Sequence, residues 1–263
     1  MKTRSDASSD LSGAYFYQTI DLPGQPTILG AWDLRADTEA YLGHVDLAGK
    51  RVLEIGAANG YLSFHMEQRG ATVIALDLSP DLPCDLLPTP GLDATKIRAS
   101  ARAVVAGLNR AWWHAHRALG SRASLVHATA YDLPPDLAPV DICLFGSVLL
   151  HLRDPFAALS EAAQLTREAI VVTDTLNPPI TAETEKPLML VNPTLGRDAA
   201  TWWFLSPGAV KHMLAPLGFS SFTLGSHHQL FRPGFAPWGI THREDFTGPE
   251  VSGKFFTVVA RRS

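Results

Sequence analysis

Two acidic residues, with small residues between them, form the clearest chemical pattern in the sequence. Glu54 lies in a short apolar run, Gly56, Ala58 and Gly60 follow at alternate positions, and Asp77 closes the next apolar run. Small residues let polar atoms of a ligand approach the backbone, and a helix that opens just after this turn presents free N–H groups there. A carboxylate at a strand end can accept hydrogen bonds from both hydroxyls of a ribose. The pattern predicts a site for a ribose-containing cofactor.

These residues need a particular set of elements to hold them. The stretch from Arg51 to Ser79 is typical of a buried strand, a turn, an amphipathic helix and a second strand, which together make one βαβ unit. In an open parallel sheet the carboxyl ends of neighbouring strands form the crevice where ligands bind. We therefore expect Glu54 and Asp77 to meet at one edge of the sheet.

Glycine spacing distinguishes two kinds of cofactor. The dinucleotide fingerprint, counted from Gly56, requires glycines where Ala58 and Tyr61 stand. An acidic residue followed by glycines at alternate positions fits better, with Ala58 as the single departure. This motif resembles the first motif of the class I S-adenosylmethionine (SAM)-dependent methyltransferases. The resemblance implies that Glu54 organises the loop and reaches the methionine end of SAM, and that Asp77 binds the ribose.

A second motif runs from Val140 to Pro155. An apolar strand breaks at Gly146, His151 follows, and Asp154 with Pro155 opens a helix. This stretch resembles the family's fourth-strand motif, which implies that residues 145–148 line the cofactor and that His151 lies near the transferred methyl group. His151 is open to two interpretations, a catalytic base or a packed, hydrogen-bonded residue.

The loop after the strand at residues 123–127 wraps the adenine in this family. Thr129 stands where the family commonly has an acid, and Ala130 takes the place of the small residue, so backbone groups, Tyr131 or Asp132 are left to meet the adenine. The resemblance thus implies these cofactor-binding residues: Glu54, Gly56, Ala57, Ala58, Gly60, Asp77, Leu78, Thr129, Ala130, Tyr131, Phe145, Gly146 and Ser147.

Aromatic residues cluster in three further segments. They lie in the proline-punctuated stretch before the first strand, in a helix over residues 95–119, and at the end of a long loop. Such rings can form a pocket for a flat or apolar acceptor, or can plug a sheet edge or the core. Two adjacent Trp on one helix cannot both face the same core. We predict an acceptor pocket with His151 at its floor and these substrate-binding residues: Tyr17, Trp112, Trp113, Trp202 and Trp203.

Length and composition bound the domain organisation. The 263 residues suffice for one α/β domain, and the net charge of −4 argues against a broad nucleic-acid surface. We predict a flexible tail over 1–12, an aromatic cover segment over 13–50 and the main domain over 51–263. Cys84 and Cys143 build neither a disulfide framework nor a zinc site, so no metal is expected. With no signal-like or membrane-spanning stretch in the sequence, the expected location is the cytoplasm and no membrane partner is expected.

The expected fold is a Rossmann-like, doubly wound, seven-stranded and mostly parallel sheet with an antiparallel C-terminal hairpin. Short segments also resemble the subgroup of bacterial tRNA wobble-uridine carboxymethyltransferases. The resemblance implies transfer of the methyl group of SAM, and the aromatic residues with the acidic net charge favour a small, aromatic or apolar acceptor. A transferase acting on tRNA or a nucleobase, an NAD-dependent oxidoreductase and a non-catalytic SAM-binding module stay open as alternatives. The sequence does not indicate an oligomeric state.

Overall fold

An eight-stranded sheet forms the centre of the computed structural model, which describes residues 11–88, 91, 93–177, 180, 184–192, 199–236 and 238–262. The strand order is β1-β9-β10-β6-β5-β2-β3-β4. The parallel strands are β2 (Arg51–Ile55), β3 (Thr72–Asp77), β4 (Ser124–His127), β5 (Val140–Gly146) and β6 (Thr166–Thr175). The hairpin of β9 (Ser221–Phe231) and β10 (Val251–Arg261) pairs antiparallel with β6. This arrangement confirms the predicted Rossmann-like sheet with a C-terminal hairpin.

The eighth strand comes from the segment that precedes the main domain. β1 (Trp32–Asp33) pairs antiparallel with β9 at the outer edge of the sheet. The ring of Trp32 packs on Phe231, with ring centroids 4.5 Å apart, and on Phe255 at 5.1 Å. Part of the aromatic segment therefore plugs the sheet edge, and a two-residue strand carries too little pattern for the sequence to predict it.

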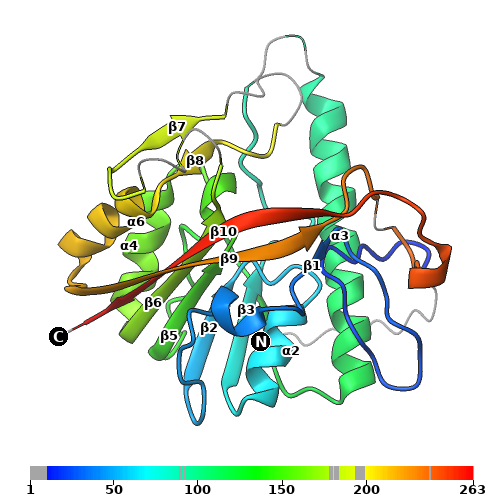
Figure 1. Cartoon of the computed structure of the whole chain (residues 1–263), viewed down its shortest axis with the longest axis horizontal. Helices are drawn as coiled ribbons and strands as arrows, with labels where there is room; N and C mark the ends of the chain where they lie inside the picture. The colour runs from blue at the N-terminus through cyan, green and yellow to red at the C-terminus, as the bar shows by residue number, and fades with distance from the viewer. Residues whose placement is uncertain are drawn as a thin grey trace.

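Helices and a small second sheet complete the fold. The α-helices are α1 (Thr38–Tyr41), α2 (Tyr61–Gln68), α3 (Ala94–Leu119), α4 (Pro155–Leu165) and α6 (Pro207–Leu214), and the 3-10 helices are η1 (Leu149–His151), η2 (Ala215–Leu217) and η3 (Arg243–Asp245). β7 (Met189–Val191) pairs antiparallel with β8 (Trp203–Leu205). In Figure 1 this pair lies on the side of α4 and α6, and α3 lies on the opposite side of the view.

Capping residues set the helix ends. Asp154 accepts a hydrogen bond from the amide of Ala157 at 2.9 Å and caps α4, with Pro155 at the first helical position. Ser206 caps α6 in the same way, by accepting from Ala209 N at 3.0 Å. Gly120 ends α3 in the left-handed conformation, with φ 60°.

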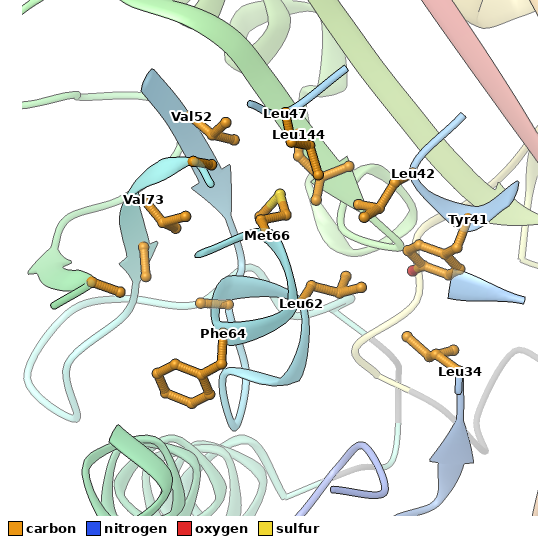
Figure 2. Packing of buried hydrophobic residues seen from close by; sticks show 14 of the residues in the cluster. Leu34, Tyr41, Leu42, Leu47, Val52, Leu62, Phe64, Met66, Val73 and Leu144 are labelled. Carbon is orange, nitrogen blue, oxygen red and sulfur yellow. The ribbon is translucent and has the colours of Figure 1, made fainter. Parts of the chain in front are cut away.

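Two hydrophobic cores cover the faces of the sheet. One core packs α1, α2 and α3 on the strands, and Figure 2 shows Leu62 and Met66 of α2 gathered with Val52, Val73 and Leu144 of the sheet. The second core packs α4 and α6 on the opposite face. Because helices cover both faces of the sheet, a ligand can bind only at the edge formed by the carboxyl ends of the strands. Among the described residues, no helix combines the length and the apolar character that a membrane crossing requires.

Candidate functional site

The turn after β2 takes its shape from three residues with positive φ. Gly56, Ala58 and Gly60 have φ values of 78°, 51° and 88°. A Cβ on Gly56 would lie 2.3 Å from Val148 Cγ2, and one on Gly60 would lie 2.6 Å from Trp112 Cδ1, so both positions exclude a side chain. The positive φ values therefore explain why small residues stand at alternate positions of this turn. Ala58 adopts the left-handed conformation that glycine takes without strain.

Asp77 at the end of β3 closes this turn from the other side. Its Oδ2 accepts a hydrogen bond from Ala58 N and its Oδ1 accepts one from Leu78 N, both at 2.7 Å. Burial raises the pKa of Asp77 to about 6, although the two amides and His127 act in the opposite direction. A carboxylate accepts about four hydrogen bonds, so capacity remains on both oxygens for a pair of ribose hydroxyls.

Glu54 forms the floor of the same cradle. Its side chain is buried, and its Oε2 accepts a hydrogen bond from Ser63 Oγ in the first turns of α2. Its Oε1 is buried and has no partner among the described residues. Burial raises the pKa of Glu54 to about 8. The hydrogen bond from Ser63 lowers this pKa, and the negative charge of Asp77 raises it further. An orphaned buried acceptor is costly, and an ammonium group of a ligand would satisfy it.

The N-terminal segment is attached to the cofactor turn by a paired contact. Gln18 N donates to Asn59 Oδ1 at 2.7 Å, and Asn59 Nδ2 donates to the carbonyl of Gln18 at 3.0 Å. Tyr17 is partly buried next to this contact, and its hydroxyl accepts from Trp32 Nε1 at 3.1 Å. Asn59 is fully buried, and only its amide in a turn of small residues could have drawn attention to it in the sequence.

The end of β5 makes a second sharp turn beside the first. Ser147 has φ 55°, its amide donates to the carbonyl of Thr173 at 2.7 Å, and its hydroxyl lies 2.9 Å from Tyr41 Oη. Gly146 faces Tyr41 closely, because a Cβ there would lie 3.2 Å from Tyr41 Cε1. The side chain of Phe145 is fully buried in the core on the α4 face. The cofactor contact predicted for Phe145 therefore stays a prediction that concerns its backbone, since the ring lies in the core.

The loop after β4 is tied to two other loops. Tyr131 Oη donates to Asp85 Oδ2, which also accepts from Arg153 N at 2.7 Å, and Asp154 N donates to Tyr131 Oη at 3.2 Å. Thr129 is partly buried and Ala130 is buried. Asp85 stands in the proline-rich loop after β3, where the sequence carries no signal that singles it out.

His151 and the strand β8 meet at η1. His151 Nδ1 lies 2.9 Å from the carbonyl of Ala200, so Nδ1 carries a proton and donates to that carbonyl. Trp202 N donates to the carbonyl of Leu150 at 2.8 Å, and Trp203 Nε1 donates to that of Leu152 at 2.9 Å. The structure thus brings His151 together with Trp202 and Trp203, and the acceptor pocket that they would line stays a prediction.

The tryptophans of α3 occupy a different place. Trp112 is fully buried against Phe64 of α2, with ring centroids 5.3 Å apart, and Trp113 packs edge-on against it at 4.8 Å. The position of Trp112 corrects its prediction as an acceptor contact, because the ring supports the turn at Gly60 from below. Trp113 is only partly buried, but it packs against the same core as Trp112, so the expectation that two adjacent rings cannot face one core is wrong.

Asp174 is a buried carboxyl at the end of β6 that the sequence reasoning did not include. Its Oδ1 accepts from Thr175 N at 2.7 Å, and its Oδ2 has no partner among the described residues. Burial raises the pKa of Asp174 to about 7, against the amides of Thr175 and Leu150. No group of three or more potential metal ligands occurs in the described part of the chain.

Comparisons with known proteins agree with this geometry. A family model described as a methyltransferase domain matches residues 33–224. The tRNA U34 carboxymethyltransferase of Pseudomonas paraeruginosa (strain DSM 24068 / PA7) is 30% identical over 180 residues, which are 67% of this chain and 47% of that protein. The ubiquinone biosynthesis O-methyltransferase of Azoarcus sp. (strain BH72) is 57% identical over 37 residues, 14% of this chain and 16% of that protein. The chain thus spans less than half the length of these curated relatives.

A solved structure shows the same fold at low identity. Magnesium protoporphyrin IX methyltransferase from Synechocystis PCC 6803, crystallised with bound SAH, is 16% identical, with a TM-score of 0.50 and coverage of 88% of this chain and 82% of that one. The family match extends over more than half of the chain and includes the turn after β2, Asp77 and the β5 motif. The chain therefore belongs to the family of methyltransferase domains, within the class I superfamily whose methyl donor is S-adenosylmethionine.

Proposed function

We propose that this domain transfers the methyl group of SAM to a small, aromatic or apolar acceptor. The observation that carries the proposal is the orphaned Oε1 of the buried Glu54, in the same cradle as Asp77. The ammonium group of the methionine moiety would favour the ionised form of Glu54 and pair with its Oε1, and Asp77 fits the ribose. A cofactor with groups of both kinds matches the cradle better than a dinucleotide does.

The residues of the chain position the reactants. SAM, when bound, supplies a methyl group on a sulfonium, which a nucleophile attacks in line as the S–C bond breaks and the electron pair stays on sulfur. Glu54 and Asp77 fix the two ends of the donor, and the β8 segment docked on η1 excludes water from the space next to His151. A hydroxyl acceptor must also lose its proton, and His151 is the side chain that takes this proton in the proposed reaction.

A second candidate is the transfer of a methyl or carboxymethyl group to a nucleobase. The 30% identity to the tRNA U34 carboxymethyltransferase favours it. The net charge of −4 favours the small molecule instead, since phosphate contacts need clustered Lys and Arg. Partly buried Trp202 and Trp203 fit either acceptor, because a base and an aromatic small molecule both stack on such rings.

Calorimetric titration with S-adenosylhomocysteine (SAH) and with NAD tests the cofactor. We expect heat with SAH and none with NAD, loss of most of the SAH affinity in Asp77→Ala, and wild-type affinity in the exposed control Asp136→Ala. Tight NAD binding without SAH binding would contradict the proposal. Transfer of labelled methyl from SAM, measured in parallel on a panel of small phenols and on bulk tRNA, then tests the acceptor class.

A further inference from the structure

A chain of buried polar side chains crosses the hairpin side of the sheet. Gln229 and His227 lie on β9 and Thr257 lies on β10, and all three are buried. Gln229 Nε2 lies 3.1 Å from the carbonyl of Asp37 and 2.9 Å from His227 Nδ1. His227 Nε2 lies 3.0 Å from Thr257 Oγ1. One end of the chain is thus the carbonyl of the residue that caps α1.

The other end of the chain is the last carbonyl of α1. Thr173 Oγ1, on β6, donates to the carbonyl of Tyr41 at 2.6 Å. Thr257 Oγ1 lies 2.8 Å from Thr173 Oγ1 and 3.3 Å from the same carbonyl. A carbonyl at a helix end has no partner inside the helix and needs one elsewhere. Side chains of three neighbouring strands therefore hold both ends of α1.

The contact of Gln229 with the carbonyl of Asp37 fixes the hydrogen-bond directions at Gln229 and His227. The carbonyl of Asp37 only accepts, so the Gln229 atom facing it is the amide nitrogen, which also donates to His227 Nδ1. His227 then carries its proton on Nε2 and donates to Thr257, whose own proton goes to Thr173 or to Tyr41 O. From Gln229 to His227, Thr257 and Thr173 the donors lead toward the carbonyl of Tyr41, and a second N–H of Gln229 donates to Asp37. Burial lowers the pKa of His227 to about 4, in keeping with this neutral tautomer.

α1 connects this chain to the cofactor turns. The hydroxyl of Tyr41 lies 2.9 Å from Ser147 Oγ at the end of β5. Thr38 Oγ1 lies 2.8 Å from the hydroxyl of Tyr61, the first residue of α2 after Gly60. Figure 2 shows Tyr41 between Leu42 and Leu34, with its ring on the side of Leu62. α1 therefore contacts both turns, while side chains of β6 and of the hairpin hold its two ends.

From this arrangement we infer that His227 is a positioning residue for the cofactor site. It acts through Thr257, Thr173 and α1, and it keeps Tyr41 against Ser147 in the conformation that receives the adenosyl cofactor. The inference rests on the proposed function, since it assigns a role toward the donor of that same reaction. It links a residue of the C-terminal hairpin to turns that lie 80 or more residues earlier in the chain.

The test compares SAH affinity in variants that break the chain with a neighbour that does not belong to it. His227→Leu removes both ring nitrogens, and Thr257→Val removes one hydroxyl with little change of shape. His228→Leu is the matched control, because His228 is the next residue on β9 and is exposed. Calorimetry at a temperature where all variants are folded should show SAH binding weaker by about tenfold in both chain variants, equivalent to about 1.4 kcal/mol, and unchanged in the control.

A rescue variant separates positioning from packing. His227→Gln keeps an N–H that can reach Thr257, so its SAH affinity should lie within about threefold of the wild type. Wild-type SAH affinity in both chain variants, with only a lower melting temperature, would overturn the inference and leave the proposed function standing. A wild-type protein that binds no SAH would instead overturn the proposed function.

Discussion

Replacing Ala58 by glycine should make the protein more stable. Ala58 has φ 51° and is only partly buried, and its amide donates to Asp77 Oδ2. Holding a non-glycine residue in the left-handed region costs about 1–2 kcal/mol. The greater freedom of glycine in the unfolded chain takes back about 0.5–1 kcal/mol. Taking the middle of each range, the net gain is about 0.75 kcal/mol, or roughly 1.5–3 °C in melting temperature for a domain of this size.

Ala57→Gly is the matched control next to this site. Ala57 is fully buried and its φ is not positive, so glycine there loses a buried methyl group worth about 0.8 kcal/mol and gains no relief of strain. Urea unfolding of both variants should therefore shift in opposite directions, with Ala58→Gly up and Ala57→Gly down. If Ala58→Gly were destabilised as much as Ala57→Gly, the strain assigned to this turn would be refuted.

Four further predictions concern the cradle and its cover. Burial raises the pKa of Glu54 from 4.5 to about 8 in the folded protein, so its contribution to stability is lost as pH rises through this window. The free energy of unfolding, measured in urea, should therefore fall between about pH 5.5 and 7.5. In Glu54→Gln that fall should be shallower by up to about 1.4 kcal/mol per pH unit. Asp77→Ala should weaken SAH binding by about 1.5–3 kcal/mol, with Asp77→Asn in between; equal affinity in all three proteins would show that the ribose lies elsewhere. Asn59→Ala leaves the backbone of Gln18 unpaired and should cost about 1–3 kcal/mol and speed limited proteolysis before β1, whereas unchanged cleavage would mean that the contact does not hold the segment. With an acceptor from the phenol panel, His151→Ala should lower kcat by about 10²–10⁴ at unchanged SAM affinity if His151 is the base, and an unaltered kcat would leave it a packing residue.

Sequence signals predicted those parts of the structure that depend on neighbours in the chain. The helix start at Asp154 and Pro155 lies where cap chemistry predicts it, and Ser206 and Gly120 are helix-end residues of the same local kind. The seven principal strands follow from apolar runs together with the family resemblance. Each of these features depends on a few consecutive residues, and a single sequence displays them directly.

Contacts between distant segments were not predictable in the same way. Nothing near Asp85 indicates that it meets Tyr131, which is 46 residues away, and the pairing of Tyr41 with Ser147 spans 106 residues. The burial of Trp112 depends on where α3 packs, because one of two adjacent tryptophans had to enter the core and the sequence does not say which. Such contacts depend on how the elements dock, and the pattern inside one element carries no information about that.

The contacts of Asp85 bear on how fast the site can exchange its cofactor. One carboxyl oxygen joins the loop that directly follows Asp77 to the phenol of Tyr131 and to the amide of Arg153. The same loop also reaches Ala199 through Leu87 N at 2.8 Å. Because this loop begins directly after Asp77, we expect spent donor bound at Asp77 to leave faster when the bonds of Asp85 open together. Under the proposed function, loop opening would then limit kcat, and the methyl-transfer step would be faster than product release.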